Sequence, residues 1–229
     1  MRTALSLFAA ALLVASAAWA GPATETVAPS GRWLAAQLEA LGVESKWIAG
    51  HHIDWRSGLP DGRPERGNGR HTHCSAIVAA AAEQLGVHIL RPPEHGQVLL
   101  ANAQFEWLGE DGADEGWRPL RDGEAAQAAA NAGDFVVAAY ESHRDDKPGH
   151  IAILKPAPRS EAELAADGPL VIQAGTVNSA AVSLREGFSG HPAAWRDHEV
   201  RYYAHAVVAS PSRGAMRIAP SSRTCSPLQ

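Results

Sequence analysis

The stretch RHTHCSAIVAAAAEQLG, residues 70–86, decides the fold prediction for this chain. It follows a Gly-rich segment, contains a long run of small apolar residues and ends at Gly86. Such a run predicts a central helix that its neighbours pack closely and that a glycine terminates. Cys74 stands at the expected first turn of this helix. Because the positive end of a helix dipole favours thiolate over thiol, Cys74 is a candidate nucleophile.

A second stretch, KPGHIAIL at residues 147–154, supplies a candidate partner for that cysteine. His150 opens an apolar run typical of a strand, and Gly149 before it leaves room for a close approach. A neutral imidazole there can take a thiol proton and later return it to a leaving amine. An isolated strand-end histidine is by default only hydrogen-bonded. The helix-start cysteine upstream is what favours a catalytic interpretation of His150.

A third polar group usually holds such a histidine in one tautomer and orientation. Gln173 is the single polar residue in the apolar strand predicted at residues 170–174, and its amide oxygen can accept a hydrogen bond from the imidazole. A position facing solvent is the simpler explanation for an isolated glutamine. Asn178, in a predicted turn further along, is the alternative third member.

The order of predicted elements indicates the fold class. Helices are expected over residues 31–41, 74–85, 94–108 and 123–131, and strands over 135–140, 150–154, 170–174, 181–184 and 200–208. Helices first and an antiparallel sheet afterwards is the α+β pattern. Residues 43–73 have few periodic apolar positions and predict a long loop that forms one wall of the site. Trp55 in that loop is expected to line a cleft.

The ends of the chain predict export. Residues 1–20 combine Arg2, a short apolar stretch and the small-x-small pattern Ala18-Trp19-Ala20, as in a secretory signal peptide. We expect cleavage near Ala20, a lead-in over 21–30, one domain over 31–208 and a disordered tail over 209–229. The mature protein is then periplasmic or secreted. No other segment is apolar for long enough to span a bilayer, so no integral membrane segment is expected.

Charge and cysteine content bound the partners. The chain has 20 Lys and Arg against 25 Asp and Glu, and the basic residues are scattered, which argues against nucleic acid as a partner. Two cysteines in an exported chain first suggest a disulfide. Cys225, however, lies in the Ser/Pro-rich tail, where a disulfide would constrain little. The sequence therefore favours a free Cys74.

Four short motifs in this order resemble the NlpC and CHAP group of papain-fold cysteine hydrolases. The motifs are Cys74-Ser75 at a helix start, Gly133-Asp134 before a strand, Gly149-His150 at a strand start, and Gln173-Ala174-Gly175. Residues 70–88 and 128–178 carry the resemblance. It implies a papain-like α+β fold in which the cysteine helix packs on a small antiparallel sheet. It also implies hydrolysis of amide bonds in peptide or peptidoglycan substrates through a thioester, with no cofactor.

The resemblance also implies roles for individual residues. Cys74 would be the nucleophile, with its own backbone N–H in the oxyanion hole, His150 the base and acid, and Gln173 the third polar member. Cell-wall endopeptidases of this group usually carry Asp before the cysteine, where it helps to bind the amine of the substrate. This chain has His73 there and keeps Ser75 after the cysteine. With Trp55, these two residues are the candidates for substrate binding.

Two other functions remain open from the sequence. One is a catalytically silent module on the same fold that binds the cell wall or another partner. The other is a zinc-binding protein, because His71, His73 and Cys74 offer ligand types that suit zinc, with His51 and His52 nearby in sequence. No hydrolytic metal motif completes this cluster, so no metal site is assigned.

Overall fold

The computed structural model describes residues 26–64, 71–144 and 147–208. The predicted signal peptide at 1–20 and the tail with Cys225 lie outside these residues. Among the described helices, none is both long and apolar enough to cross a lipid bilayer.

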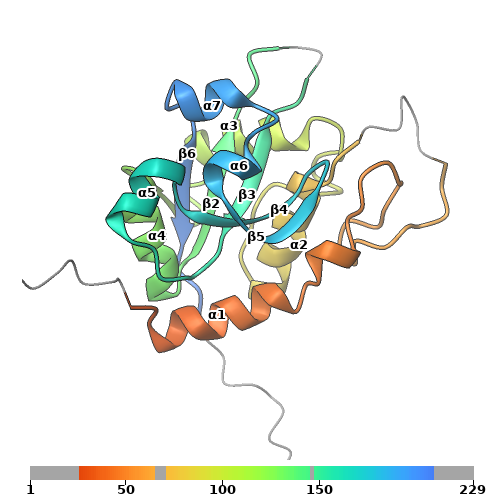
Figure 1. The fold of residues 1–229 in the computed structure, drawn as a ribbon. Helices are drawn as coiled ribbons and strands as arrows, with labels where there is room; N and C mark the ends of the chain where they lie inside the picture. The colour runs from red at the N-terminus through yellow and green to blue at the C-terminus, as the bar shows by residue number, and fades with distance from the viewer. Residues whose placement is uncertain (1–25, 65–70, 145–146, 209–229) are drawn as a thin grey trace, which may run out of the picture.

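A single antiparallel sheet of six strands organises the described chain, in the spatial order β1-β6-β2-β3-β4-β5 (Figure 1). The central strands β2, β3 and β4 are almost entirely buried, as their runs of apolar residues predict. The strands are β1 (Trp117–Leu120), β2 (Phe135–Tyr140), β3 (His150–Leu154), β4 (Leu170–Ala174), β5 (Asn178–Ser183) and β6 (Arg201–His205).

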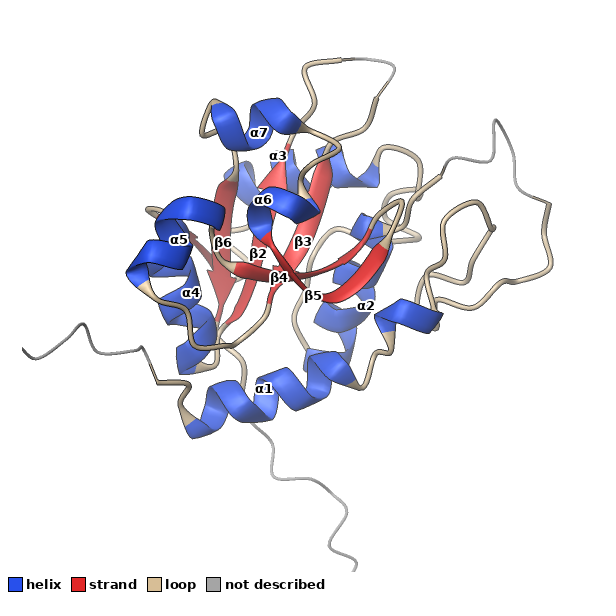
Figure 2. Ribbon diagram, viewed as in Figure 1, coloured by secondary structure: helices blue, strands red, loops and turns tan. Residues whose placement is uncertain are grey.

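Helices cover both faces of this sheet, so the molecule has the α+β architecture expected from the order of its elements (Figure 2). One apolar core lies between the sheet and α1, α2 and α3. A second core lies on the opposite face, against α4, α6 and α7. The helices are α1 (Pro29–Glu39), the 3-10 turn η1 (Val43–Ser45), α2 (Cys74–Leu85), α3 (Leu100–Glu110), α4 (Gly123–Ala132), α5 (Glu161–Asp167), α6 (Leu184–Gly187) and α7 (Pro192–Arg196).

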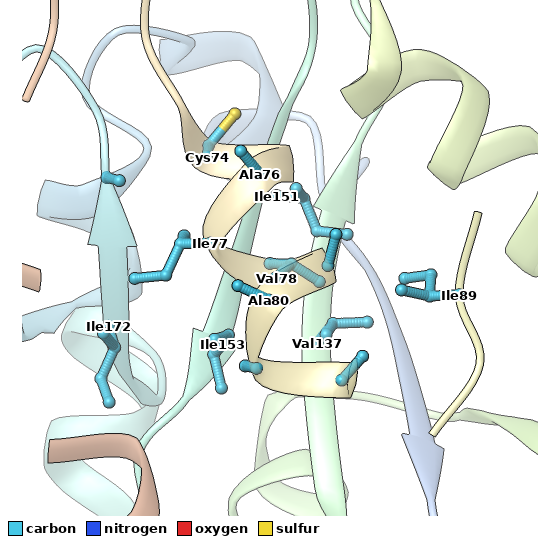
Figure 3. Packing of buried hydrophobic residues seen from close by; sticks show 14 of the residues in the cluster. Cys74, Ala76, Ile77, Val78, Ala80, Ile89, Val137, Ile151, Ile153 and Ile172 are labelled. Atoms are coloured by element: carbon cyan, nitrogen blue, oxygen red, sulfur yellow. The ribbon is translucent and has the colours of Figure 1, made fainter. Parts of the chain in front are cut away.

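Helix α2 is the centre of the first core (Figure 3). It begins at Cys74, as predicted, and Gly86 ends it in the left-handed conformation at φ 72°. Every residue from 74 to 82 is buried. Ile77 and Val78 face the apolar side chains of the sheet, among them Ile151 of β3. The alanines on either side of this pair, Ala76 and those at 79–82, have no side chain beyond Cβ, which allows this helix to lie close to the strands.

The predicted bounds of the three central strands agree with the structure. The predicted bounds of other elements differ from it, for local reasons. Strands 135–140, 150–154 and 170–174 are confirmed. The helix expected from residue 94 starts only at Leu100, because Leu99 takes a left-handed conformation at φ 56° that interrupts helical geometry. The strand expected at 181–184 begins earlier, at Asn178, so Asn178 lies in β5 and not in a turn. Strand β1 and the short helices α6 and α7 were not predicted.

The close packing of α2 generates a stability prediction. Ala79 is completely buried, so Ala79→Leu forces extra volume into a filled core and should lower the free energy of unfolding by about 1–3 kcal/mol. Gln84→Leu on the exposed side of the same helix is the matched control, expected to change it by less than about 0.5 kcal/mol. Urea denaturation followed by circular dichroism measures both. Equal effects of the two substitutions would contradict the packing described for α2.

Candidate active site

Cys74 is the first residue of α2, and its free thiol is only 4% exposed. Figure 3 shows its sulfur directed away from the apolar side chains deeper along the helix. The backbone N–H groups of Cys74 and Ser75 lie near the sulfur and lower the pKa of the thiol. These groups belong to the first helical turn, where N–H donors have no partner within the helix. The local geometry of a helix start thus surrounds the thiol with donors.

The start of α2 fills an opening between β3 and β4. These strands pair only at Ile153 with Ile172 and at Leu154 with Val171, away from the end where Cys74 lies. Beyond those pairs, the N–H of Ile151 lies close enough to the Cys74 sulfur to lower the pKa of its thiol. The carbonyl of Ala174 accepts the N–H of His73 at 3.3 Å. The end of β4 therefore holds the residue that precedes α2.

His150 is fixed at the beginning of β3 by its backbone. It pairs with Tyr140 of β2. Just before it, the N–H of Gly149 donates to Oδ1 of Asn102 in α3 at 2.6 Å. A Cβ on Gly149 would lie 2.1 Å from the carbonyl oxygen of Tyr140, so no side chain fits there. Asn102 was missed by sequence reasoning, because nothing local links it to a residue this far along the chain.

Gln173 fixes the tautomer of His150. Nε2 of His150 lies 2.9 Å from Oε1 of Gln173, while Nε2 of Gln173 donates to the carbonyl of Val177 at 3.0 Å. The second bond orients the amide so that its oxygen faces the imidazole. An oxygen accepts only from an N–H, so the proton of the neutral ring is on Nε2. Nδ1 of His150 therefore keeps its lone pair and is the nitrogen able to take a proton.

Two aromatic rings contact this imidazole on the face opposite α2, and a third ring contacts one of them. Phe188 meets the His150 ring edge-on at 4.7 Å between centroids, and His191 lies nearly parallel to it at 6.1 Å. Tyr140 contacts His191 at 5.3 Å. Phe188 belongs to the second apolar core, together with Ala152, which shares a strand face with His150. Neither Phe188 nor His191 was predicted, because short helices carry almost no periodic signal.

Burial favours the uncharged forms of the cysteine and of both histidines at this site. Burial lowers the pKa of His150 to about 4, and the hydrogen bond to Gln173 opposes that shift only in part. Burial likewise lowers the pKa of His191 to about 4, with repulsion from Lys147 and His150 adding to it. Burial raises the pKa of the Cys74 thiol, and the surrounding N–H groups offset this incompletely. The helix dipole alone predicts the opposite direction for Cys74, and burial outweighs it.

Cys74 and His150 lie at the same end of β3 but do not touch through a hydrogen bond. Within the described residues, no bond joins the Cys74 sulfur to the imidazole. The thiol is on the side of α2, whereas the ring packs toward Phe188 on the other face. The N–H of Ile151, the residue next to His150, lies near the sulfur. The two candidate catalytic groups thus flank the same opening without a hydrogen bond between them in this conformation.

A cleft of about 620 Å³ lies beside the first turn of α2. Three candidates for substrate binding line it: His73, Ser75 and Trp55. His73 and Ser75, on either side of Cys74 in the sequence, are both nearly buried. Trp55 is also nearly buried, at 6% exposed, so it forms a wall and not an open platform. The described parts of the loop, residues 43–64 and 71–73, thus supply one side of a hollow next to the site, as expected from the sequence.

Two sequence-based alternatives do not fit the geometry. Asn178 is not near the imidazole, because its amide donates to the carbonyls of Val43, Lys46 and Trp47 at 2.7–3.3 Å. It anchors the loop after α1 and cannot be the third member. In the described part of the chain, no three His, Cys, Asp or Glu side chains gather to hold a metal ion. The proposed zinc ligands are therefore not assembled into a metal site here.

Comparison with known proteins adds no identification. No family model matches the chain, and no curated protein matches its sequence. The site must therefore be interpreted from its own chemistry.

The neutral, buried thiol generates a labelling prediction. In a Cys225→Ser variant, which leaves one thiol, native Cys74 should react with iodoacetamide about tenfold or more slowly at pH 7 than the same variant unfolded in urea. The reasons are its 4% exposure and its raised pKa. Intact-protein mass against time measures the rate. Rapid labelling near pH 6 in the folded protein would mean that a thiolate is already present at rest.

Proposed function

We propose that this chain is an exported cysteine hydrolase of papain-like fold that cleaves amide bonds in cell-wall peptides. One observation carries the proposal. A helix-start cysteine sits in the opening between two strands whose side chains, His150 and Gln173, are hydrogen-bonded to each other at 2.9 Å. Buried polar groups cost free energy unless they are paired. A purely structural role would not require a cysteine, a histidine and a glutamine together at a strand opening beside a cleft.

The chemistry follows from the tautomer of His150. Nδ1 takes the thiol proton of Cys74 as the sulfur attacks the substrate carbonyl carbon, and a tetrahedral intermediate forms. The imidazolium then gives that proton to the leaving amine, the C–N bond breaks, and a thioester remains. His150 next takes a proton from water, which attacks the thioester and releases the acid and the thiol. Rotation of the thiol or the ring must first bring Nδ1 within reach of the sulfur.

The backbone around Cys74 suits the charge that develops on the substrate oxygen. The N–H groups of Cys74 and Ser75 face the sulfur in the free protein. A carbonyl attacked by that sulfur comes to lie among the same donors, which makes the N–H of Cys74 the expected oxyanion contact. Gln173 acts through His150, since it holds the ring but does not reach the reacting atoms.

A silent binding module on the same fold is the second candidate. The buried, protonated thiol and the missing thiol–imidazole bond favour it. In that case the cleft beside Cys74 would bind a partner without turnover. The two functions differ in whether a covalent acyl-enzyme forms.

The deciding experiment uses the mature protein and purified sacculi. The wild type should release peptide fragments that mass spectrometry identifies, and Cys74→Ala and His150→Ala should each reduce release by about a thousandfold or more. Rapid acid quenching should show the mass of an acyl group on Cys74 in the wild type alone. Binding to sacculi without release, equal for wild type and Cys74→Ala, would establish the silent module instead.

The protonation of His150 sets the acid side of the pH profile. The base must be neutral, so kcat/KM should rise with pH through about 4, the pKa that burial gives His150. Gln173→Glu places a carboxylate on the imidazole and favours its charged form, so the rise should move to higher pH by about one unit or more.

Gln173→Ala is the matched control for that shift. It removes the hydrogen bond that raises the pKa of His150, so kcat/KM should still rise at or below pH 4. The value of kcat should fall, because the imidazole is no longer held in its orientation. Initial rates on one released peptide bond, measured over the pH range in which each variant stays folded, give the profiles. If kcat/KM of the wild type instead rose near the ordinary histidine pKa of about 6.5, the assignment of a buried His150 as the base would be contradicted.

A further inference from the structure

Helix α3 is hydrogen-bonded to both of the segments that carry the candidate catalytic pair. Oδ1 of Asn102 accepts the N–H of Gly149, the residue before the candidate base, at 2.6 Å. Nε2 of Gln104 donates to the carbonyl of Ser75, the residue after the candidate nucleophile, at 3.3 Å. The nucleophile and the base come from distant parts of the chain, and one helix is bonded one residue away from each of them.

Gln104 also joins α3 to the segment that follows α2. Its side chain is completely buried, and the same Nε2 donates to the carbonyl of Leu90 at 2.9 Å. Leu90 follows Ile89, whose side chain packs beside α2 in the first core (Figure 3). One amide group therefore links α3, the first turn of α2 and the segment beyond the end of α2.

The bond from Gln104 to Ser75 is not needed to satisfy that carbonyl. In an α-helix the carbonyl already accepts from the N–H four residues further on, so Gln104 adds a second bond to a group that has a partner. Among the described residues, Oε1 of Gln104 is buried without a hydrogen bond, and an unpaired buried acceptor costs free energy. A methionine would fill much the same space without that cost. The glutamine is therefore better explained by the position that it gives to the start of α2 than by stability.

Asn102 holds the start of β3 at close range. The residue after Gly149, His150, begins the pairing of β3 with Tyr140 of β2. A Cβ on Gly149 would lie 2.7 Å from Oδ1 of Asn102, so only a glycine lets α3 approach the strand this closely. The backbone that enters β3 is thus fixed from β2 on one side and from α3 on the other.

We infer that Asn102 and Gln104 are positioning residues that work as one clamp, by which α3 holds the starts of α2 and β3 at the separation from which the Cys74 thiol and the His150 imidazole can meet. The inference rests on the proposed function, because it gives these two side chains a part in the reaction of the same site. Both act through the backbone next to the reacting residues, and neither lines the cleft beside α2. Loss of either bond slows the chemical step and leaves substrate binding unchanged.

Substitutions of similar volume break each bond separately. Asn102→Leu removes the acceptor for Gly149, whereas Asn102→Asp keeps an oxygen there and is the conservative variant. Gln104→Met removes the donor to Ser75 at nearly constant volume. Leu108→Ala is the control for lost stability, because this residue of α3 is 3% exposed and its truncation opens a cavity while both bonds stay in place.

The first measurement is the division of each effect between kcat and KM on one released peptide bond. Asn102→Leu and Gln104→Met should each lower kcat about tenfold, because a small displacement of the reacting groups has a large effect on rate. KM should stay within about twofold, since binding in the cleft is unaffected. Asn102→Asp and Leu108→Ala should keep about half of kcat or more, although Leu108→Ala should lower the urea midpoint of unfolding the most.

The double variant Asn102→Leu/Gln104→Met tests whether the two bonds act as one clamp. A clamp released at one end no longer holds the other, so kcat of the double variant should also be only about tenfold below that of the wild type. Two independent structural roles would instead multiply to about a hundredfold.

A bifunctional alkylating reagent measures the same separation without turnover. In a Cys225→Ser background, 1,3-dibromoacetone alkylates Cys74 and then bridges it to an imidazole within reach, and peptide mass spectrometry identifies the bridge to His150. The bridged share of the alkylated protein should fall about fivefold or more in Asn102→Leu and Gln104→Met, because closure of the bridge depends on the distance between the two groups. The Asn102→Asp and Leu108→Ala variants should resemble the wild type.

The two measurements separate this inference from the proposed function. If no peptide is hydrolysed but the bridge forms and depends on both bonds, the hydrolase proposal fails and the clamp stands. If hydrolysis occurs and the double variant loses the product of the single effects, or kcat follows the urea midpoint across the variants, the clamp is overturned and the hydrolase proposal survives. A wild type that forms no bridge between Cys74 and His150, or bridging that neither substitution changes, would also overturn the clamp.

Discussion

The interrupted pairing of β3 with β4 is the constraint on which the rest of the site depends. Buried N–H and C=O groups need partners, and the two strands stop supplying them to each other beyond Ile153. The start of α2 supplies one of the missing partners, because the N–H of His73 donates to the carbonyl of Ala174 at the end of β4. The N–H of Ile151 in β3 lies near the Cys74 sulfur. Sliding α2 by one residue would leave the carbonyl of Ala174 without its donor.

The same architecture explains why the two faces of the sheet carry different parts of the site. Side chains alternate along β3, so Ile151 packs under α2 while His150 turns toward Phe188. The opening between the strands is the place where groups from the two faces can meet. Gln173 follows the same alternation on β4 and so reaches His150 and not Cys74. A cysteine and a histidine on opposite faces can act together only at such an opening.

The sequence predicts those parts of the site that depend on local patterns. The small-residue run after Cys74 and the apolar runs at 150–154 and 170–174 give the helix start and the two strands, and a single polar residue in an apolar strand identifies Gln173. Contacts between distant segments leave no such pattern. Asn102 reaches Gly149 across the fold. Strand β1 is a four-residue edge strand containing Pro119, so it carries almost no strand signal.

The sequence alone also does not determine the protonation state of Cys74, which depends on the balance between burial and the helix dipole. A helix start favours a thiolate, but nine buried residues in a row bring Cys74 into the core with it, and desolvation then opposes charge. His150 is subject to the same burial. Two neutral partners form no ion pair at rest, so in the proposed mechanism proton transfer accompanies attack on the substrate carbonyl. The proposed export to an oxidising compartment gives this a chemical advantage, because a buried, protonated thiol resists oxidation where a resting thiolate would not. The burial that makes Cys74 slow to react without substrate is thus compatible with its use as a nucleophile once a substrate carbonyl lies among the N–H donors of the first turn of α2.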